Sequence, residues 1–457
     1  MSAPRTRSGP QLVVVGAGLA GLVAAWRLQR AGRAVTVLER EAAPGGRLQS
    51  EWRDGFTCEG GNPVLSTADR RLRAWIEEIG LRDELLPLRP VVTAQVRSGP
   101  QVVVDTRDWT GIARIPGLGL PGAARLLRLP RLLRRYGPAL DPERPERAAA
   151  LDDRSLADFG RLYFGRRVLE RWMEPAATTR FLGEADQTSR ALFLRWLHAR
   201  DGAHLGLPRA GLGEVPRAAA ARLAVRYGVR VTRIETAGGG RLRLGLRPQG
   251  GGPGGERVRE AEGVVVATSA EEAQRIAAPL LAPAERDLLG AVRYLPSVVL
   301  HVALRRPFHP HPLFVRVPHA EGSPLESLLL EPGVAGERVP AGRGLARLQA
   351  TSAWSAAHYD LPAETAEKEL LDAFDALRPG ARGAIVFALL QRVPRALPHF
   401  AVGHYRALAR FERVQADQRA AGRRLCFAGD YLAEPSFEGA VRSAERAAER
   451  LIGGDVG

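Results

Sequence analysis

The sequence predicts an α/β fold in which a Rossmann-like domain is interleaved with an α+β domain. Near the N-terminus, the valine-rich run 12–15 leads into the glycine motif 16–21 and an apolar helix, the order of a βαβ unit that binds a dinucleotide. Near the C-terminus, an apolar run at 425–428 precedes a turn and a second apolar helix that begins at Gly439 and Ala440. A chain of 457 residues suits two interleaved domains better than one compact domain.

The N-terminal segment has the parts that a dinucleotide site requires. Gly16 allows a tight turn, Gly18 lets a pyrophosphate approach the backbone, and Gly21 lets the helix pack against the strand. The N–H groups at the start of the helix favour phosphate. A second strand, 34–38, ends at Glu39, where an acid accepts hydrogen bonds from a ribose 2′-hydroxyl and disfavours a 2′-phosphate. The predicted contacts of this segment are Gly16, Gly18, Leu19, Ala20, Gly21, Glu39 and Arg40.

The residues that follow distinguish FAD from NAD. With Pro44-Gly45-Gly46-Arg47 and Glu59-Gly60-Gly61-Asn62, the sequence resembles the flavoprotein superfamily that contains amine oxidases, protoporphyrinogen oxidase and the carotenoid and squalene desaturases. The resemblance implies a non-covalent FAD in a domain of the glutathione-reductase-2 type. It places Arg47 near the pyrophosphate and the loop 59–62 near the flavin ring. The implied contacts here are Gly45, Gly46, Arg47, Gly60, Gly61 and Asn62.

The C-terminal segment resembles the last strand and helix of the same superfamily. The resemblance implies that Asp430 contacts the ribityl or pyrophosphate region, and that the helix starting at Gly439 aims N–H groups at the flavin. A helix N-terminus there stabilises the negative charge of the reduced ring. In the middle of the chain, Val231 is implied to contact the adenine and Ala267 to end the return strand. The remaining implied contacts are Gly429, Asp430, Glu438, Gly439 and Ala440.

The resemblance also implies a discontinuous FAD-binding domain with two inserted stretches. A helix is predicted over 217–227, with short strands at 229–235, 241–246 and 264–267. The predicted boundaries are FAD-binding domain 1–84, substrate domain 85–207, FAD-binding domain 208–290, substrate domain 291–420 and FAD-binding domain 421–457.

The segment 119–136 alternates leucines with arginines and contains no acid. This composition is typical of a basic amphipathic helix, here predicted to break at Pro130, that lies on an anionic bilayer. An alternative is a helix whose leucines pack on the substrate domain. No segment reaches membrane-spanning length, so we expect a cytoplasmic protein, attached at most to the inner face of the membrane.

Composition excludes several function classes. The net charge of +16 would suit a nucleic-acid partner, but Lys368 is the only lysine and the arginines are spread along the whole chain. Without a basic stripe interleaved with aromatic residues, we expect no nucleic-acid binding. Cys58 and Cys426 are far apart in apolar stretches, so we expect buried thiols, no disulfide and no metal site.

The chemistry expected from these residues is dehydrogenation by hydride transfer to flavin N5, which needs a dry pocket more than an acid or base. No catalytic side chain is identified. Many amine oxidases use a lysine beside the flavin, and Lys368 in an acidic helix is a departure from that pattern. Among the other relatives, the resemblance implies a large hydrophobic substrate: a porphyrinogen first, from the stretch 391–406, and a polyisoprenoid second, from the turn 428–431 with residues 438–440. An amine oxidase and a non-catalytic flavin-binding protein remain as further alternatives. Arg180 is a candidate cation for an acidic substrate.

Overall fold

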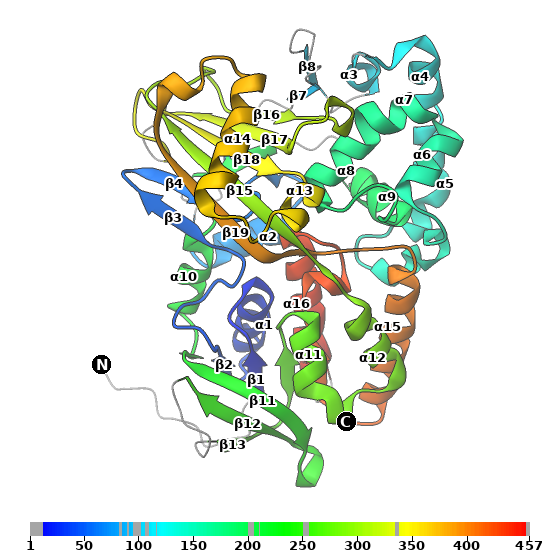
Figure 1. Ribbon diagram of the computed structural model, residues 1–457. Coiled ribbons are helices and arrows are strands. Elements are labelled where there is room, and N and C mark those ends of the chain that lie inside the picture. Colours follow the sequence, from blue (N-terminus) through cyan, green and yellow to red (C-terminus); the bar gives the residue numbers. More distant parts are fainter. Residues whose placement is uncertain are drawn as a thin grey trace.

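The structure is a computed structural model that describes residues 12–81, 85–88, 91–94, 102–105, 109–115, 117–199, 205–209, 211–249, 256–333 and 338–453. It has three parts (Figure 1): a lower lobe around a parallel sheet, an upper lobe around a larger mixed sheet, and a layer of helices beside both.

A five-stranded parallel sheet with the order β10-β2-β1-β14-β20 forms the centre of the lower lobe. Its strands come from three distant stretches of the chain, 12–38, 225–266 and 425–427. Because the strands are parallel, their carboxyl ends lie along one edge of the sheet, where ligands of such sheets bind. The bounds are β1 Leu12–Val15, β2 Val35–Leu38, β10 Val225–Arg226, β14 Val264–Val266 and β20 Leu425–Phe427.

Both faces of this sheet are covered. On one face Val14, Val265 and Cys426 share a core with helices α1 and α16. On the other face Val13 and Val266 share a core with the antiparallel strands β11, β12 and β13 and with helices α11 and α12. Burial on both sides explains why β1, β14 and β20 are apolar throughout rather than alternating. The bounds are α1 Leu19–Arg30, α11 Ala270–Ala277, α12 Pro283–Ala291, α16 Phe437–Ile452, β11 Val229–Thr236, β12 Leu242–Pro248 and β13 Arg257–Ala261.

A seven-stranded mixed sheet with the order β19-β15-β18-β17-β16-β7-β8 forms the upper lobe. Strands β7 and β8 come from the first inserted stretch and the other five from the second, so both inserts build one sheet. One face is apolar and packs on α14 through residues such as Leu300, Leu348 and Phe374. The bounds are β7 Val91–Ala94, β8 Val102–Asp105, β15 Tyr294–Leu304, β16 Leu313–Arg316, β17 Leu325–Pro332, β18 Gly344–Ala350, β19 Ile385–Pro398, α13 Ser352–Ala357 and α14 Ala363–Leu377.

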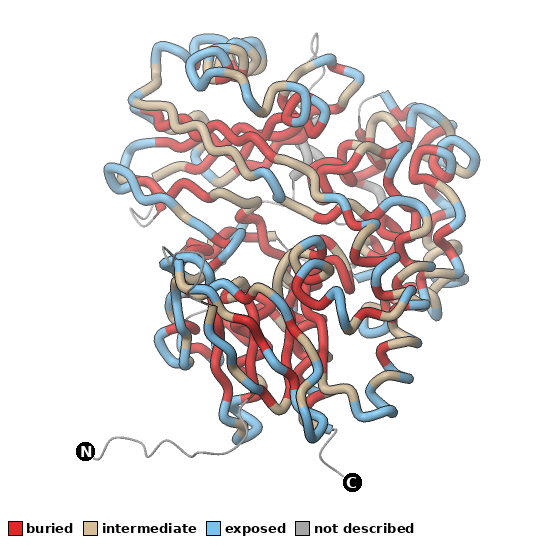
Figure 2. The backbone as a smooth tube through the Cα atoms, turned by 60° about the horizontal axis from the view of Figure 1, so that its bottom comes forward, coloured by how far each residue is buried: buried red, intermediate tan, exposed pale blue. Residues whose placement is uncertain are grey.

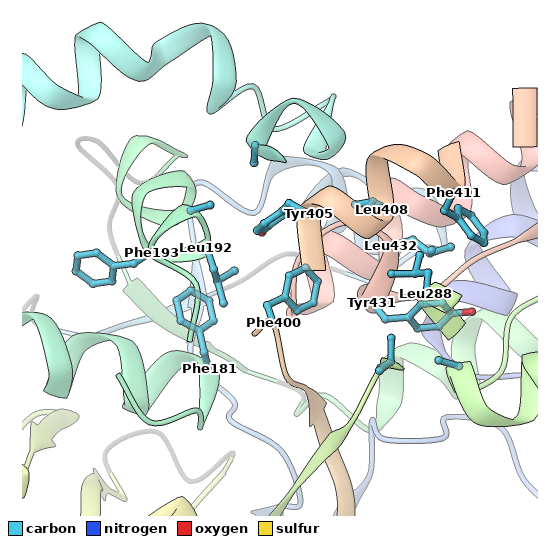
Figure 3. Packing of buried hydrophobic residues seen from close by; sticks show 14 of the residues in the cluster. Phe181, Leu192, Phe193, Leu288, Phe400, Tyr405, Leu408, Phe411, Tyr431 and Leu432 are labelled. Atoms are coloured by element: carbon cyan, nitrogen blue, oxygen red, sulfur yellow. The ribbon is translucent and has the colours of Figure 1, made fainter. Parts of the chain in front are cut away.

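The helical layer shares a buried core with the lower lobe, and this core contains several aromatic side chains. Phe181, Phe193, Phe400, Tyr405 and Phe411 belong to one cluster of buried side chains, which Figure 3 shows at close range. The same cluster includes Val13 and Val266 of the parallel sheet, and Figure 2 shows buried segments in both the helical layer and the lower lobe. The bounds are α3 Trp109–Ala113, α4 Gly119–Leu126, α5 Leu129–Tyr136, α6 Leu156–Tyr163, α7 Arg166–Val168, α8 Glu174–Phe181, α9 Arg190–Ala199 and α15 His404–Ala420.

Smaller strands and helices complete the described chain. Two of the sheets are the pair β3–β4 and the triplet β5-β9-β6. The bounds are β3 Ser50–Arg53, β4 Phe56–Glu59, β5 Leu65–Ser66, β6 Leu85–Leu88, β9 Leu205–Pro208, α2 Arg70–Glu78 and α10 Glu214–Ala220.

Two helices predicted in the middle of the chain have other bounds in the structure. The helix predicted over 217–227 is α10, which begins at Glu214 and ends at Ala220, because the chain then turns to pair β10 with β2. The predicted break at Pro130 lies earlier, between α4 and α5, at residues 127–128. Pro130 is inside the first turn of α5, where a proline removes no intrahelical hydrogen bond.

Candidate functional site

The glycine motif after β1 forms a tight turn at the carboxyl edge of the parallel sheet. Gly16 has φ of +102°, and a β-carbon there would lie 2.8 Å from the carbonyl oxygen of Ala267. A β-carbon at Gly21 would lie 1.9 Å from the carbonyl oxygen of Gly16. Both glycines are therefore required by the packing of the turn itself. Ala267, whose N–H donates to the carbonyl of Val15 at 2.9 Å, closes this turn from β14.

Gly18 has a different environment, since a β-carbon there would meet no described atom within 4 Å. It is the residue before α1, and no side chain caps the helix at that position. The N–H groups of Leu19, Ala20 and Gly21 belong to the first turn, which has no intrahelical acceptors. This uncapped start beside an open glycine has the room and the donors that a pyrophosphate requires.

The glycine-rich segment 44–47 lies against this turn. Gly45 N–H donates to the carbonyl of Ala17 at 2.9 Å, and Gly18 and Gly45 form a parallel bridge. Gly45 and Gly46 both have positive φ, +123° and +57°. The structure thus brings the predicted segment 45–47 beside the predicted phosphate turn.

Glu39 follows β2 at the same sheet edge and is 9% exposed. Its carboxylate accepts hydrogen bonds from the N–H groups of Ala17, at 2.6 Å, and Glu41, at 2.9 Å. A carboxylate has about four acceptor positions, so capacity remains for a ribose hydroxyl. Glu39 thus stabilises the glycine turn after β1, in addition to the ribose contact that the sequence predicts for it. Arg40 points away into an exposed ion pair with Glu41 at 3.0 Å.

Arg47 and Asp430 join the two ends of the chain in a bidentate ion pair, with N–O distances of 2.7 and 2.9 Å. The guanidinium also donates to the carbonyl of Ala396 at 3.2 Å and lies 5.7 Å from the ring centre of Tyr294. Two residues predicted separately as FAD contacts therefore form one unit. Tyr294 and Ala396 were not predicted as site residues, because only pairing of β15 with β19 brings them to Arg47.

The start of α16 differs from the prediction. The helix begins at Phe437, and the N–H of Gly439 donates to the Ser436 hydroxyl at 2.9 Å, while that of Ala440 donates to the Ser436 carbonyl at 3.0 Å. These two N–H groups are satisfied within the chain. A β-carbon at Gly439 would lie 2.2 Å from the carbonyl oxygen of Glu434, so this glycine is required by packing.

Glu438 bonds both to the start of α2 and to an arginine of its own helix. Its carboxylate accepts from the N–H groups of Leu72, at 2.9 Å, and Arg71, at 3.3 Å, and pairs with Arg442 at 3.0 Å. Burial raises the pKa of this carboxyl, and Arg442 opposes the shift. Of the remaining predicted contacts, Gly61 lies beside Arg47 and Phe437, whereas Gly60 lies beside Gln49 and Gln391. Val231 is in β11, and Gly429 follows β20.

A pocket opens beside the loop that contains Asn62 and beside Glu438. It is lined by Asn62, Val64, Ser66, Ala68, Asp69, Thr179, Arg180, Trp196, Ala199, Leu205, Phe314, Arg316, Glu434, Glu438 and Arg442. Apolar rings and three arginines thus share one lining. Arg180, the cation considered from sequence, is in this set. Arg316 and Arg442 were missed, because no local motif marks them and only the sheet and α16 bring them here.

Arg180 is held only loosely by a neighbouring acid. Its Nη2 lies 3.9 Å from Asp69 Oδ1, and its buried Nε has no hydrogen-bond partner among the described residues. Burial raises the pKa of Asp69, and the Arg180 charge opposes that shift. A second carboxylate entering the pocket would therefore find an available donor.

Other titratable candidates lie away from this pocket. Lys368 is exposed on α14 and pairs with Asp372 at 3.2 Å, as its acidic surroundings predict. Cys58 and Cys426 are buried and unpaired, and burial raises their thiol pKa values to about 12 and about 11. Within the described ranges, no three His, Cys, Asp or Glu side chains are grouped to hold a metal ion.

One protein-family model and several known proteins match this chain. The family model described as "Flavin containing amine oxidoreductase" matches residues 19–452. A phytoene dehydrogenase from Streptomyces griseus is 33% identical over 51% of this chain and 51% of its own. Protoporphyrinogen oxidase 2, chloroplastic/mitochondrial, from Arabidopsis thaliana is 26% identical over 37% of this chain and 32% of its own. The matched region therefore spans about half, or less, of the length of these curated relatives.

The fold is also that of solved flavoprotein structures. A wild-type putrescine oxidase bound to putrescine superposes with a TM-score of 0.76 at 18% identity, covering 97% of this chain and 99% of that one. At this identity the likeness shows the fold alone, and it confirms the predicted α/β architecture.

Proposed function

The chain belongs to the flavin-containing amine oxidoreductase family, and on that premise we propose that it dehydrogenates a large apolar substrate that bears carboxylates, with a porphyrinogen as the first candidate. The predicted FAD cofactor is confirmed by the family. When bound, FAD would supply an acceptor for the hydride that leaves a substrate carbon, and the substrate would release a proton at the same time.

The residues present fit this cofactor. Gly18 leaves open space at the uncapped start of α1. Glu39 directly follows the second strand, which is the sequence position expected for the acid that contacts a ribose. Arg47, Asp430 and Asn62 would border the rest of the cofactor. Asn62 and Glu438 line the pocket as well, so the substrate pocket adjoins the segments that the family uses for its flavin.

The observation that favours a carboxylate-bearing substrate is the set of arginines in this pocket. Arg180 is only 22% exposed, and its closest acid, Asp69, is 3.9 Å away. Burying a loosely paired guanidinium is costly in a channel built for hydrocarbon alone. A carboxylate of the substrate would offset that cost by a charge-assisted hydrogen bond. Trp196 and Phe314 offer apolar surfaces on the same lining, which suits the ring system of a porphyrinogen.

The second candidate is a polyisoprenoid. The relative from Streptomyces griseus is a phytoene dehydrogenase, and a zeta-carotene-forming phytoene desaturase from Myxococcus xanthus is 30% identical over 53% of this chain and 51% of its own. Amine oxidation is disfavoured by the position of Lys368, because the only lysine of the chain is 75% exposed on the outer helix α14.

One anaerobic experiment separates these candidates. The oxidised holoprotein is mixed with protoporphyrinogen, with phytoene in detergent, or with putrescine, and bleaching of the flavin absorbance is followed. We expect bleaching by protoporphyrinogen and none by putrescine. Bleaching by phytoene alone would establish the second candidate, and bleaching by putrescine would overturn both.

A further inference from the structure

Three leucines of the helical layer are exceptionally exposed. Leu120, Leu127 and Leu162 are 87%, 73% and 66% exposed. The next most exposed large apolar side chain among the described residues is Val258, at 58%. The other leucines of the basic segment are packed: Leu126 and Leu129 are 2% and 0% exposed, and Leu132 and Leu133 pack against the main core. The basic segment 119–136 therefore contains some leucines that belong to the core and others that lie exposed on the surface.

The exposed leucines come together on one corner of the molecule. Leu120 and Leu127 are seven residues apart along α4 and its end, so they project from the same side. Leu162 is in the last turn of α6, and the carbonyls of the two residues after it accept hydrogen bonds from arginines in and just after α4. Arg128 Nη1 donates to the carbonyl of Tyr163 at 3.0 Å, and Arg125 Nη1 donates to that of Phe164 at 3.4 Å. Figure 1 shows α4, α6 and α7 at this corner.

Positive charge surrounds these leucines. Residues 117–140 include five arginines and no acid, and all five are exposed. Arg166 and Arg167 of α7 add two more. The nearby acids Asp158 and Glu170 each pair with an arginine, Arg161 at 3.6 Å and Arg166 at 2.5 Å. We call this set the basic leucine surface: Leu120, Leu127, Leu162, Arg125, Arg128, Arg131, Arg134, Arg135, Arg166 and Arg167.

A cavity of about 260 Å³ opens within this surface, between α4 and α7. Leu118, Pro121 and Phe164 provide apolar walls, and Arg125, Arg166 and Arg167 provide guanidinium groups on the same lining. Arginine binds phosphate oxygens bidentately. A site with an apolar wall and several guanidinium groups suits the phosphate and the adjoining glycerol of an anionic lipid.

We propose that the basic leucine surface docks on an anionic phospholipid bilayer, with the three leucines inserted among the acyl chains and the cavity at α7 holding a lipid phosphate. Apolar insertion and attraction of arginines to anionic lipid act together in such binding. A second protein copy would need an acidic complement to the arginines of this surface, whereas the acids beside it, Asp158 and Glu170, are already paired with arginines. No helix among the described residues has the length and apolarity to cross a bilayer, so the attachment is at one face.

Vesicle sedimentation of the holoprotein tests this docking. With vesicles of phosphatidylcholine and phosphatidylglycerol in a 3:1 ratio we expect at least tenfold more bound protein than with phosphatidylcholine alone, and a fall at 0.5 M salt. The variant L120S/L127S/L162S should lose at least tenfold of this binding. The matched control V258S/V386S removes two exposed apolar side chains from β13 and β19 and should bind like the wild type.

Two further variants test the charge and the cavity with the leucines intact. R131Q/R134Q/R135Q should lose the preference for phosphatidylglycerol, and R167Q should weaken binding without abolishing it. Flavin absorbance and melting temperature report folding, and both should stay unchanged in every variant. Equal binding to both vesicles, or full binding by the leucine variant, would overturn the proposal. So would a wild-type dimer that the leucine substitutions dissociate, since a second copy would then cover this surface. Turnover is not a readout here, so a failed substrate proposal leaves this outcome intact.

Discussion

Arg47 and Asp430 are 383 residues apart in sequence, and both guanidinium Nη atoms bond the carboxylate, at 2.7 and 2.9 Å. Arg47 follows the first glycine motif and Asp430 follows the last strand of the parallel sheet. The same guanidinium meets Ala396 in β19 and Tyr294 in β15. One ion pair therefore links both ends of the cofactor domain to the sheet of the inserted domain.

The variants R47Q and D430N should each weaken FAD binding and destabilise the apoprotein, by about 1–2 kcal/mol of unfolding free energy, since Arg47 is partly exposed and the pair is partly screened. Urea unfolding of the apoprotein and FAD titration measure the two effects. The double variant should cost less than the sum of the single ones. Strict additivity in this cycle would show that the two side chains are not coupled.

The glycines of the first motif should fall into two classes. G18A should fold like the wild type, because a β-carbon there meets no described atom, and it should reduce FAD affinity at least tenfold, because the methyl group would occupy the phosphate approach. G21A should lower the melting temperature of the apoprotein itself, because its β-carbon would lie 1.9 Å from the Gly16 carbonyl. Thermal melting with and without FAD separates the classes, and an unchanged FAD affinity in G18A would exclude this phosphate path.

Arg180 should determine affinity for the carboxylates of the substrate. R180Q should raise KM or the half-saturating concentration in flavin reduction about 10–100-fold, as expected for loss of one charge-assisted hydrogen bond, with a small effect on the limiting rate. R180K should restore part of the affinity. The matched control R217Q changes an exposed arginine that pairs with Glu214 and should behave as the wild type. Equal kinetics of R180Q and wild type would remove Arg180 from the substrate site.

Stability should fall between pH 6.5 and about pH 4 because of His404. Burial lowers the pKa of this histidine to about 4, although its bond to the Tyr431 carbonyl, at 3.0 Å, acts in the opposite direction. Below pH 6.5 the histidine is protonated in the unfolded chain, while in the folded chain it stays neutral down to about pH 4. The contribution of His404 to the free energy of unfolding is therefore complete above pH 6.5 and is lost as the pH falls. The expected loss at pH 5 is about 2 kcal/mol.

The variant H404Q keeps a donor for Tyr431 but cannot titrate. Chemical denaturation at pH 7.5 and pH 5 should therefore show a smaller difference for H404Q than for the wild type. Some dependence should remain, because burial also lowers the pKa of His301, to about 3. An identical pH dependence in both proteins would show that His404 does not contribute.

The sequence by itself determined the cofactor domain, because its signals are local. Residues 12–39 form a strand, a glycine turn, a helix and a second strand that ends at an acid, and the backbone requirements of each are met by residues close by in the sequence. Accordingly, β1, α1 and β2 form where expected. The same holds for β20 and for Gly439, where the turn leaves no room for the β-carbon of any other residue. The family and its FAD were predictable for this reason.

Only the tertiary structure decided which side chains share the pocket and the surface. Arg180, Arg316 and Arg442 come from α8, β16 and α16 and meet only through the packing of three separate elements. Leu127 and Leu129 have the same local composition around them, yet one is 73% exposed and the other fully buried. Burial of a side chain depends on which element packs over it, and that contact is made by residues far away in the chain.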